Sequence, residues 1–320
     1  MPDILLVKTS SLGDVVHNLP VATDIRRHVA GAAIDWVVEE AYAPLVRLHP
    51  AIRDAIPVAM RRWRRNLGSM ATWQELRALR ATLAAKTYDA VIDTQGLLKS
   101  ALIVRRARGT KHGFSRSTVR EPLATRVYDV AHDVPRAQHA VERNRQLAAA
   151  ALGYAIDGPP DYGVRVPTAA PGGLPRHFCV LLHSTSRADK LWPEADWQAL
   201  GARLAERGAA CVLPWGAPEE EARSRRLASA IPNAIVPGAM SLDTLARLLG
   251  HAELVVGVDT GLAHLAVAAG APTVAVFLGS DPSLTGVYGS ARAKNVGALG
   301  AKPSLAEVIA AVRDVAPGSL

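Results

Sequence analysis

The most informative stretch of this chain runs Val255-Val256-Gly257-Val258-Asp259-Thr260-Gly261-Leu262-Ala263-His264. An apolar, β-branched run ends in an acid, a hydroxyl and a glycine, and a helix-forming segment with a histidine follows. In an open α/β sheet, ligands bind beyond the carboxyl ends of the strands, near helix N-termini. The stretch therefore predicts a strand, a ligand-binding turn and a helix. A tight turn with Asp259 as an N-cap is the simpler alternative.

The same alternation of strands and helices extends through the whole chain. In the first half the patterns predict strands at 4–7, 34–38, 52–58, 90–93 and 111–114, a loop at 8–18, and helices at 20–28, 73–86, 97–107 and 139–152. In the second half they predict strands at 178–182, 210–213, 234–236, 254–258 and 273–277, and helices at 194–207, 219–229, 241–250, 262–269 and 305–315. Such alternation predicts an α/β fold with parallel sheets covered on both faces.

A linker rich in Pro, Gly and Asp is expected at 153–173. We therefore expect two domains, 1–158 and 159–320. The closing helix at 305–315 could pack back on the first domain.

Composition limits the class of protein. The chain has 320 residues, 49% of them hydrophobic, enough for two domain cores. No segment approaches the ~20 uninterrupted apolar residues of a membrane span, and a strand starts too early to leave room for a signal peptide. Cys179 and Cys211 lie in apolar strand-like runs, which predicts buried thiols in a reduced, cytoplasmic protein. The histidines show no metal-ligand spacing, so no metal site is expected.

The excess of positive over negative charge lies entirely in the first half. The formal net charge is +8; residues 1–160 contain 23 Lys and Arg against 15 Asp and Glu, whereas residues 161–320 contain 14 of each. This asymmetry predicts an anionic partner for the first half, although an arginine-rich genome could explain part of it. The basic residues include Arg61, Arg62, Arg64, Arg65, Arg105, Arg106, Arg108, Lys111, Arg116 and Arg120. Nucleic acid, phospholipid headgroups and a phosphorylated lipid all fit, but no motif or aromatic platform supports RNA binding, so we expect no nucleic acid.

Two polar segments directly follow predicted strands. The first, at 8–14, contains Ser10, Gly13 and Asp14 and matches neither common phosphate-loop fingerprint. Asp14 could act as a general base toward a sugar hydroxyl, or simply cap a loop or helix. The second, at 183–193, offers hydroxyls and Lys190 to phosphate oxygens, while Trp192 is predicted to pack in the core.

Three further features complete the candidate ligand site of the second half. The backbone amides at 260–262 could cradle a phosphate. The acids Glu219, Glu220 and Glu221 open a helix, where they could complement its dipole or hold a ribose diol. Met240 could line an adenine pocket next to Ser241, a natural N-cap.

Taken together, these segments resemble the lipopolysaccharide heptosyltransferase family. The resemblance rests on Asp189-Lys190-Leu191-Trp192-Pro193 and on the segments 7–15, 36–40, 61–64, 93–100, 111–113, 120–123, 138–143, 213–218 and 259–264. They occur in the family's order and span nearly the whole chain.

The resemblance implies a GT-B glycosyltransferase with two Rossmann-like domains facing across a cleft. The acceptor would bind the N-terminal domain and the nucleotide sugar the C-terminal one. The donor would be ADP-L-glycero-β-D-manno-heptose, a substrate rather than a cofactor, and the acceptor the inner Kdo of Kdo2-lipid A. It implies inversion at the anomeric carbon without an obligatory metal. The enzyme would lie peripherally on the cytoplasmic face of the inner membrane and serve lipopolysaccharide inner-core biosynthesis.

The resemblance also implies roles for individual residues. Asp14 would deprotonate the acceptor hydroxyl. The donor would be held by Thr185, Ser186, Lys190, Asp259, His264 and the amides of Thr260 and Gly261, with Glu220 on the ribose and Met240 on the adenine. Glu219 and Glu221 remain alternatives to Glu220. The anionic acceptor would be held by Ser10, Gly13, Arg61, Arg62, Arg64 and Arg120.

Two other functions remain open. The enzyme that adds the second heptose shares the donor motif, although the segments 36–40 and 61–64 favour addition of the first. A non-catalytic nucleotide-sugar-binding protein is the alternative from another class, because an α/β fold alone does not establish catalysis.

Overall fold

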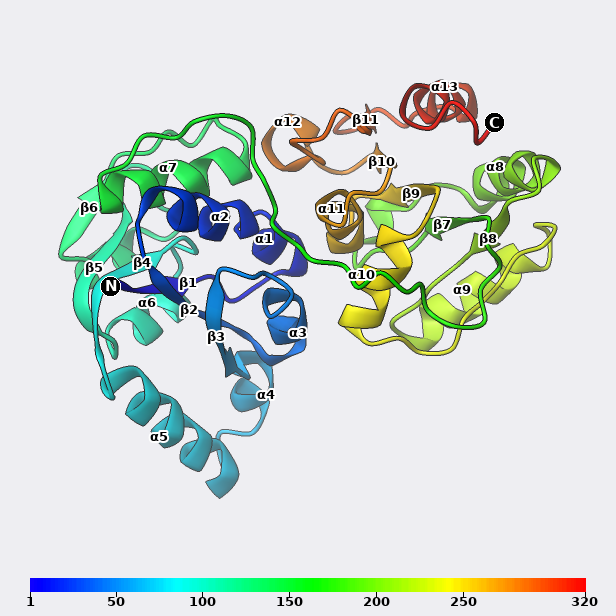
Figure 1. Cartoon of the computed structure of the whole chain (residues 1–320). Coiled ribbons are helices and arrows are strands. Elements are labelled where there is room, and N and C mark those ends of the chain that lie inside the picture. Colours follow the sequence, from blue (N-terminus) through cyan, green and yellow to red (C-terminus); the bar gives the residue numbers. More distant parts are fainter. The chain divides into compact units, whose positions relative to one another are not determined.

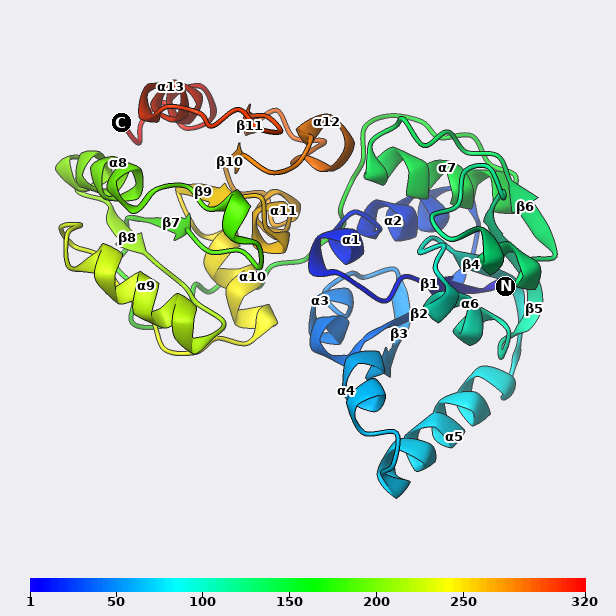
Figure 2. The same cartoon turned by 180° about the vertical axis from the view of Figure 1, so that it is seen from behind.

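The computed structural model describes all 320 residues as two compact units, Met1–Val164 and Arg165–Leu320 (Figures 1 and 2). Each unit is built on one parallel β-sheet with helices around it. The predicted α/β class with two parallel-sheet domains is therefore confirmed. None of the helices combines the length and the apolar character required to cross a membrane.

The first unit contains a six-stranded parallel sheet in the order β3-β2-β1-β4-β5-β6. Its strands are β1 (Asp3–Val7), β2 (Ala33–Glu39), β3 (Ile52–Val58), β4 (Thr87–Asp93), β5 (Arg108–Phe114) and β6 (Val130–His132). This is the strand order of the Rossmann fold, which follows from right-handed crossovers in both directions from a central strand. β1 lies at that centre, and residues Ile4 to Val7 are fully buried.

The helices of the first unit include short ones that the sequence patterns missed. They are α1 (Leu12–Val16), α2 (Leu19–His28), α3 (Ala43–Val46), α4 (Met60–Arg65), α5 (Met70–Ala84), α6 (Leu98–Val104) and α7 (Ala140–Leu152), with 3-10 turns at Glu40–Tyr42 and Pro122–Val127. The predicted loop at 8–18 is wrong in its second part, because Ser11 and Asp14 support a turn of helix there. α4 escaped notice because Trp63 is its single buried anchor among four arginines.

The second unit contains a five-stranded parallel sheet in the order β11-β10-β9-β7-β8. Its strands are β7 (Phe178–Leu182), β8 (Ala210–Val212), β9 (Leu254–Val258), β10 (Thr273–Phe277) and β11 (Ala293–Gly297). The strand predicted at 234–236 shrinks to one parallel bridge between Val212 and Ile235, because prolines at 232 and 237 bracket it. With that bridge counted, both sheets follow the same topological plan.

The helices of the second unit cover both faces of this sheet. They are α8 (Glu194–Glu206), α9 (Pro218–Ala228), α10 (Leu242–Gly250), α11 (Gly261–Ala268), α12 (Pro282–Thr285) and α13 (Leu305–Val315), with a 3-10 turn at Ala188–Lys190. The closing helix α13 packs on β10 and β11 of its own unit.

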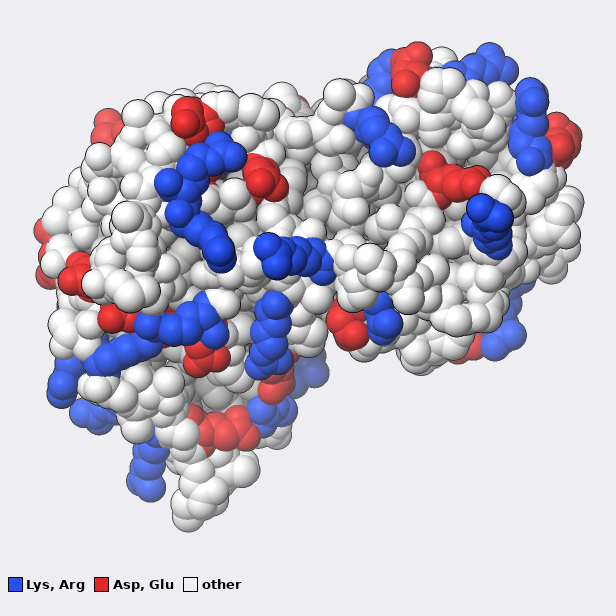
Figure 3. Space-filling view, viewed as in Figure 1, with Lys and Arg blue, Asp and Glu red and all other residues white.

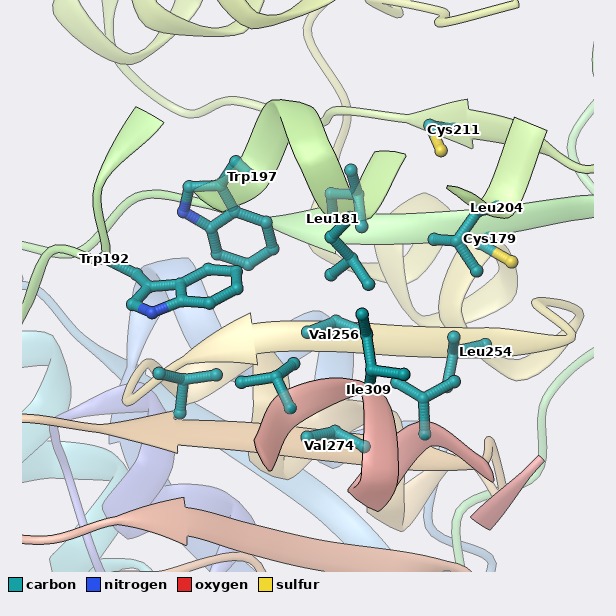
Figure 4. Close-up of a cluster of buried hydrophobic side chains, with 14 of the residues drawn as sticks. Cys179, Leu181, Trp192, Trp197, Leu204, Cys211, Leu254, Val256, Val274 and Ile309 are labelled. Carbon is teal, nitrogen blue, oxygen red and sulfur yellow. The ribbon is translucent and has the colours of Figure 1, made fainter. Parts of the chain in front are cut away.

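Figure 4 shows the core between this sheet and α8 and α13. The rings of Trp192 and Trp197 pack edge to face with their centroids 5.1 Å apart, and the Trp192 indole N–H donates to the Pro303 carbonyl at 3.2 Å. Trp192 is thus a packing residue, as predicted. Cys179 and Cys211 are buried free thiols on adjacent strands, also as predicted, and burial raises the pKa of each to about 12.

Candidate active site

In both sheets, polar residues follow the strands at the point where the strand order changes direction. The reversal lies between β1 and β4 in the first unit and between β7 and β9 in the second. Ligands of open α/β sheets bind outside the carboxyl ends of the strands at such switch points. The predicted site residues that follow β1, β7 and β9 therefore stand where the fold favours ligand binding.

Asp14 lies in the first turn of α1, directly beyond the carboxyl end of β1. Its Oδ2 accepts hydrogen bonds from the Ser11 backbone N–H at 2.7 Å and from the Ser11 hydroxyl at 3.0 Å. Asp14 is half-buried, and Gly13 precedes it as the second residue of α1. The capping role considered as the alternative is thus present in the structure. A carboxylate held in this way is also oriented, which a general base requires.

The loop between β1 and α1, which leads to Asp14, rests on the turn after β4. The Gln95 side-chain carbonyl accepts from the backbone N–H of Thr9 at 2.9 Å and of Ser10 at 3.2 Å. Both residues and Gln95 are buried. A single amide side chain therefore sets the path of the backbone between β1 and α1.

The turn at Gln95 is in turn supported by the fully buried carboxylate of Asp93. Asp93 accepts from the backbone N–H groups of Gln95 and Gly96, at 2.9 and 3.1 Å, and from the hydroxyls of Ser100 and Tyr128, both at 2.8 Å. Burial raises the pKa of Asp93, and these four donors oppose the shift. Gly96 has φ +65° and close side-chain neighbours, so the turn requires glycine there.

Two lysines that the sequence analysis did not assign belong to this site. Lys8 is 6% exposed and donates from Nζ to the Thr94 carbonyl at 2.8 Å. Lys99, on α6, donates to the Ser10 hydroxyl. Burial lowers the pKa of both lysines, and the negative charge of Asp14 opposes the shift in each case. Lys99 follows β4 at the switch point, which is the signal that could have identified it.

The predicted acceptor arginines differ in their surroundings. Arg61 and Arg120 add positive potential at Lys99 and are exposed, as is Arg64. Arg62 instead makes paired hydrogen bonds to Glu40, at 3.2 and 3.0 Å, and to Glu75, at 2.9 and 3.0 Å. The guanidinium of Arg62 is thus already occupied by two carboxylates, unlike its neighbours on α4.

In the second unit, Asp259 is the centre of the candidate donor site. It follows β9, and its Oδ2 is bound by the Lys190 ammonium and by the Ser280 hydroxyl. His264 Nε2 lies 3.9 Å from Oδ1, and the Thr185 hydroxyl donates to the Asp259 carbonyl at 3.1 Å. Burial alone would raise the pKa of Asp259, but the bonds from His264, Lys190 and Ser280 hold it well below its usual value.

The N-terminus of α11 faces the same strand edge. Thr260 is its N-cap and Gly261 its first residue, so the leading amides of α11 have no partner within the helix. Ser186 is exposed in the loop after β7. Ser280 escaped the sequence analysis, although it follows β10, the neighbour of β9, at the same edge.

The three glutamates in the first turn of α9, after β8, differ in their contacts. Glu220 reaches back and accepts from the Gly216 N–H at 2.8 Å, whereas Glu221 pairs with Arg225 at 2.6 Å and Glu219 is exposed. Glu220 is therefore the carboxylate at the strand end. Met240 is half-buried just before α10, and the Trp215 indole ties the two loops together by donating to the Pro237 carbonyl at 2.8 Å. No group of three or more His, Cys, Asp or Glu side chains is arranged to hold a metal ion.

Comparisons with known proteins identify the family of this chain. The family model Glycosyltransferase family 9 (heptosyltransferase) matches residues 76–310. Lipopolysaccharide heptosyltransferase 1 of Escherichia coli K12 is 46% identical over 296 residues, covering 89% of this chain and 91% of the relative.

Two solved structures are also similar. E. coli heptosyltransferase WaaC with ADP has a TM-score of 0.91 at 43% identity and covers 99% of both chains. The same enzyme with ADP-2-deoxy-2-fluoro heptose has a TM-score of 0.86 at 43% identity, covering 97% of this chain and 98% of that one. With the two Rossmann-like sheets already described, these likenesses establish the GT-B fold of the heptosyltransferases. The chain belongs to glycosyltransferase family 9, the heptosyltransferases.

Proposed function

We propose that this heptosyltransferase moves L-glycero-D-manno-heptose from ADP-heptose to the inner Kdo of Kdo2-lipid A, with inversion at the anomeric carbon. The observation that carries the proposal is that each of the two switch points presents charged side chains suited to one half of the reaction. One presents a carboxylate among cations, and the other a lysine beside the N-terminus of α11. Likeness to lipopolysaccharide heptosyltransferase 1, at 46% identity, supports this acceptor over a heptosylated one.

The first unit would bind the acceptor and activate its hydroxyl. Asp14 takes the hydroxyl proton as the acceptor oxygen bonds to the anomeric carbon. Lys99, Arg61 and Arg120 provide positive charge for Kdo carboxylates and lipid A phosphates. Ser10, in the loop after β1, and Gly13, in the first turn of α1, would line the approach, and Arg64 adds an exposed cation on α4. We assign Arg62 a supporting role, because Glu40 and Glu75 already bind it.

The second unit would bind the donor and stabilise the leaving group. When the bond between the anomeric carbon and the phosphate oxygen breaks, ADP keeps the electron pair and negative charge builds on its diphosphate. Lys190, the hydroxyls of Thr185 and Ser186 and the amides of Thr260 and Gly261 offer positive charge and hydrogen bonds there.

The rest of the donor would be recognised farther along the strand edge. Glu220 would accept from the ribose hydroxyls and Met240 would pack on the adenine. Asp259 and His264 would orient the heptose beside the phosphates. We propose that the enzyme works peripherally at the cytoplasmic face of the inner membrane, where a lipid-anchored acceptor is available.

The decisive experiment measures ADP release from ADP-heptose with and without Kdo2-lipid A, comparing the wild type with Asp14→Asn and Asp14→Ala. The asparagine can still accept from the Ser11 N–H, so it separates capping from proton transfer. We expect acceptor-dependent release that falls by roughly 10²–10⁴-fold in both variants, with ADP affinity unchanged. Release that persists in Asp14→Asn would remove Asp14 as the base. Release only with a heptosylated acceptor would assign the second transfer instead, and ADP-heptose binding without turnover would leave a binding protein.

A further inference from the structure

Three large apolar side chains project from the first unit where α4 passes into α5. Leu67 is 57% exposed, Met70 70% and Trp73 50%. We call these three residues the apolar tip. In Figure 1 the N-terminal end of α5 extends away from the sheet, and Figure 3 shows an uncharged projection in the same place. Exposed apolar side chains gathered at one point indicate an interaction site.

Hydrogen bonds within the chain hold the apolar tip in one arrangement. The Trp73 indole N–H donates to the Leu67 carbonyl at 2.9 Å, and the Ser69 N–H donates to the Asn66 carbonyl at 3.0 Å. The tip can therefore leave water without leaving the indole N–H unsatisfied, which makes its desolvation inexpensive.

The exposed face of α5 does not belong to the core of the first unit. Thr72 and Leu83 are buried, and Leu76 and Leu79 pack against the core of the first unit. These residues form the inner face of the helix, while Met70 and Trp73 lie on the outer one. Met70 and Trp73 thus make no contribution to the core of this unit.

Arginines flank the apolar tip on both sides. Arg77 and Arg80 follow Trp73 on the same face of α5, at helical spacing, and Arg65 ends α4 on the other side; all three are exposed. The single acid of α5, Glu75, is bound by Arg62 and by the Trp63 indole. The tip is therefore an apolar point bordered by uncompensated positive charge.

We infer that the apolar tip and its flanking arginines dock on the surface of an anionic lipid bilayer. Tryptophan and long aliphatic side chains partition into the interfacial region of a bilayer, while arginines meet the anionic headgroups. Three side chains are too few for a stable protein interface, which buries about 800 Å² per partner. The inference deepens the proposed function, on which it rests, since it places the first unit at the surface that would hold a lipid-anchored acceptor.

The direct test is co-sedimentation with vesicles of phosphatidylethanolamine and phosphatidylglycerol that contain no acceptor, compared with phosphatidylcholine vesicles. We expect binding to the anionic vesicles that weakens with salt. The Leu67→Ser, Met70→Ser double variant, which keeps the Trp73 hydrogen bond, should bind about tenfold more weakly. Arg77→Gln with Arg80→Gln should lose a similar factor. Leu299→Ser is the matched control, because Leu299 is 68% exposed in the second unit.

Unchanged vesicle binding in the tip variant, at wild-type thermal stability, would overturn the inference. So would a change in oligomeric mass without a change in vesicle binding, because the tip would then contact protein.

Turnover separates this inference from the proposed function. The tip variant should lose rate on Kdo2-lipid A in vesicles but keep it on a deacylated, water-soluble acceptor. If the wild type releases no ADP with either acceptor while vesicle binding still depends on the tip, the proposed function fails and the docking inference stands.

Discussion

The Lys190 ammonium is bound to the Asp259 carboxylate at the carboxyl edge of the second sheet. The cation that would meet a diphosphate is thus already neutralised by a partner from the next strand end. A diphosphate arriving there must compete with Asp259 for Lys190 and meets the negative charge of Asp259 itself. Substitutions of Lys190 and of Asp259 should therefore affect ADP binding and turnover differently.

Lys190→Met should weaken ADP binding by roughly 10–100-fold, because a hydrogen bond to a charged group contributes about 1.5–3 kcal/mol. Titration calorimetry measures the change directly. The matched control is Lys294→Met, since Lys294 forms an ion pair with Asp314 in the same unit. Equal losses in the two variants would argue for a general effect of charge rather than for contact with the diphosphate.

Asp259→Asn should strengthen ADP binding by roughly three- to tenfold, because it removes a like charge and releases Lys190. Turnover with ADP-heptose should nevertheless fall, since the proposed contact with the heptose is lost. Asp314→Asn, at the exposed pair, should leave both quantities unchanged. Weaker ADP binding in Asp259→Asn would mean that the carboxylate positions Lys190 for the phosphates rather than competing with them.

His183, at the end of β7, should make the fold less stable in acid. Burial, assisted by the positive charge of Arg223, lowers the pKa of His183 to about 4, from an unfolded-state value near 6.5. The unfolded chain therefore takes up the proton first. The stability contributed by neutral His183 is complete above pH 6.5 and is lost as the pH falls toward 4, by at most about 3 kcal/mol.

Chemical denaturation between pH 4 and 7 tests this expectation. In His183→Asn the free energy of unfolding should vary less over that range, although the variant is less stable at pH 7. His177→Asn is the control, because that ring is 67% exposed. If the free energy of unfolding of His183→Asn varies with pH as strongly as that of the wild type, another group causes the acid sensitivity.

Gln95→Leu should lower turnover while leaving ADP affinity intact. The substitution leaves the buried N–H groups of Thr9 and Ser10 without their acceptor, at a cost of about 1–3 kcal/mol. The loop that leads to Asp14 then loses the acceptor that fixes its backbone. Gln146→Leu, on α7, controls for the change of side chain, and Gln95→Glu, which keeps an acceptor oxygen, should retain more activity than leucine. A wild-type rate in Gln95→Leu would show that the loop holds its shape without this support.

Chelation should not affect the rate. In the proposed mechanism, Lys190 and the amide groups at the start of α11 would stabilise the negative charge of the leaving diphosphate without a divalent cation. ADP release measured with excess EDTA should match that measured with added Mg²⁺. A loss of rate in EDTA that Mg²⁺ restores would contradict this metal-independent mechanism.

The sequence was most informative where burial determines both structure and position. The strands Phe178–Leu182, Leu254–Val258 and Thr273–Phe277 have the predicted bounds, because parallel strands buried on both faces are unbroken apolar runs. β11 (Ala293–Gly297) gave no such signal, since it is a half-exposed edge strand. The turn of helix at Leu12–Val16 was missed because it depends on a hydrogen bond between Ser11 and Asp14 rather than on periodicity.

In the candidate site, too, the sequence predicted some residues and missed others. Asp14, Lys190 and Asp259 could be picked out because each lies in the polar segment that follows a predicted strand. The support from Gln95 was invisible, because it joins residues more than eighty positions apart. Likewise, nothing in the run of arginines at 61–65 distinguishes Arg62, whose two carboxylate partners come from other elements.

The strand order shared by the two sheets has an evolutionary consequence. Each unit has its own switch point and its own core, so mutations at one binding edge need not disturb the other. On the proposed division of binding between the units, a lineage would acquire a new acceptor through changes in the first 164 residues while its nucleotide-sugar site in the second unit stayed unaltered. Chimaeras joined between Val164 and Arg165 would test this division, because each would combine the proposed acceptor unit of one parent with the proposed donor unit of the other.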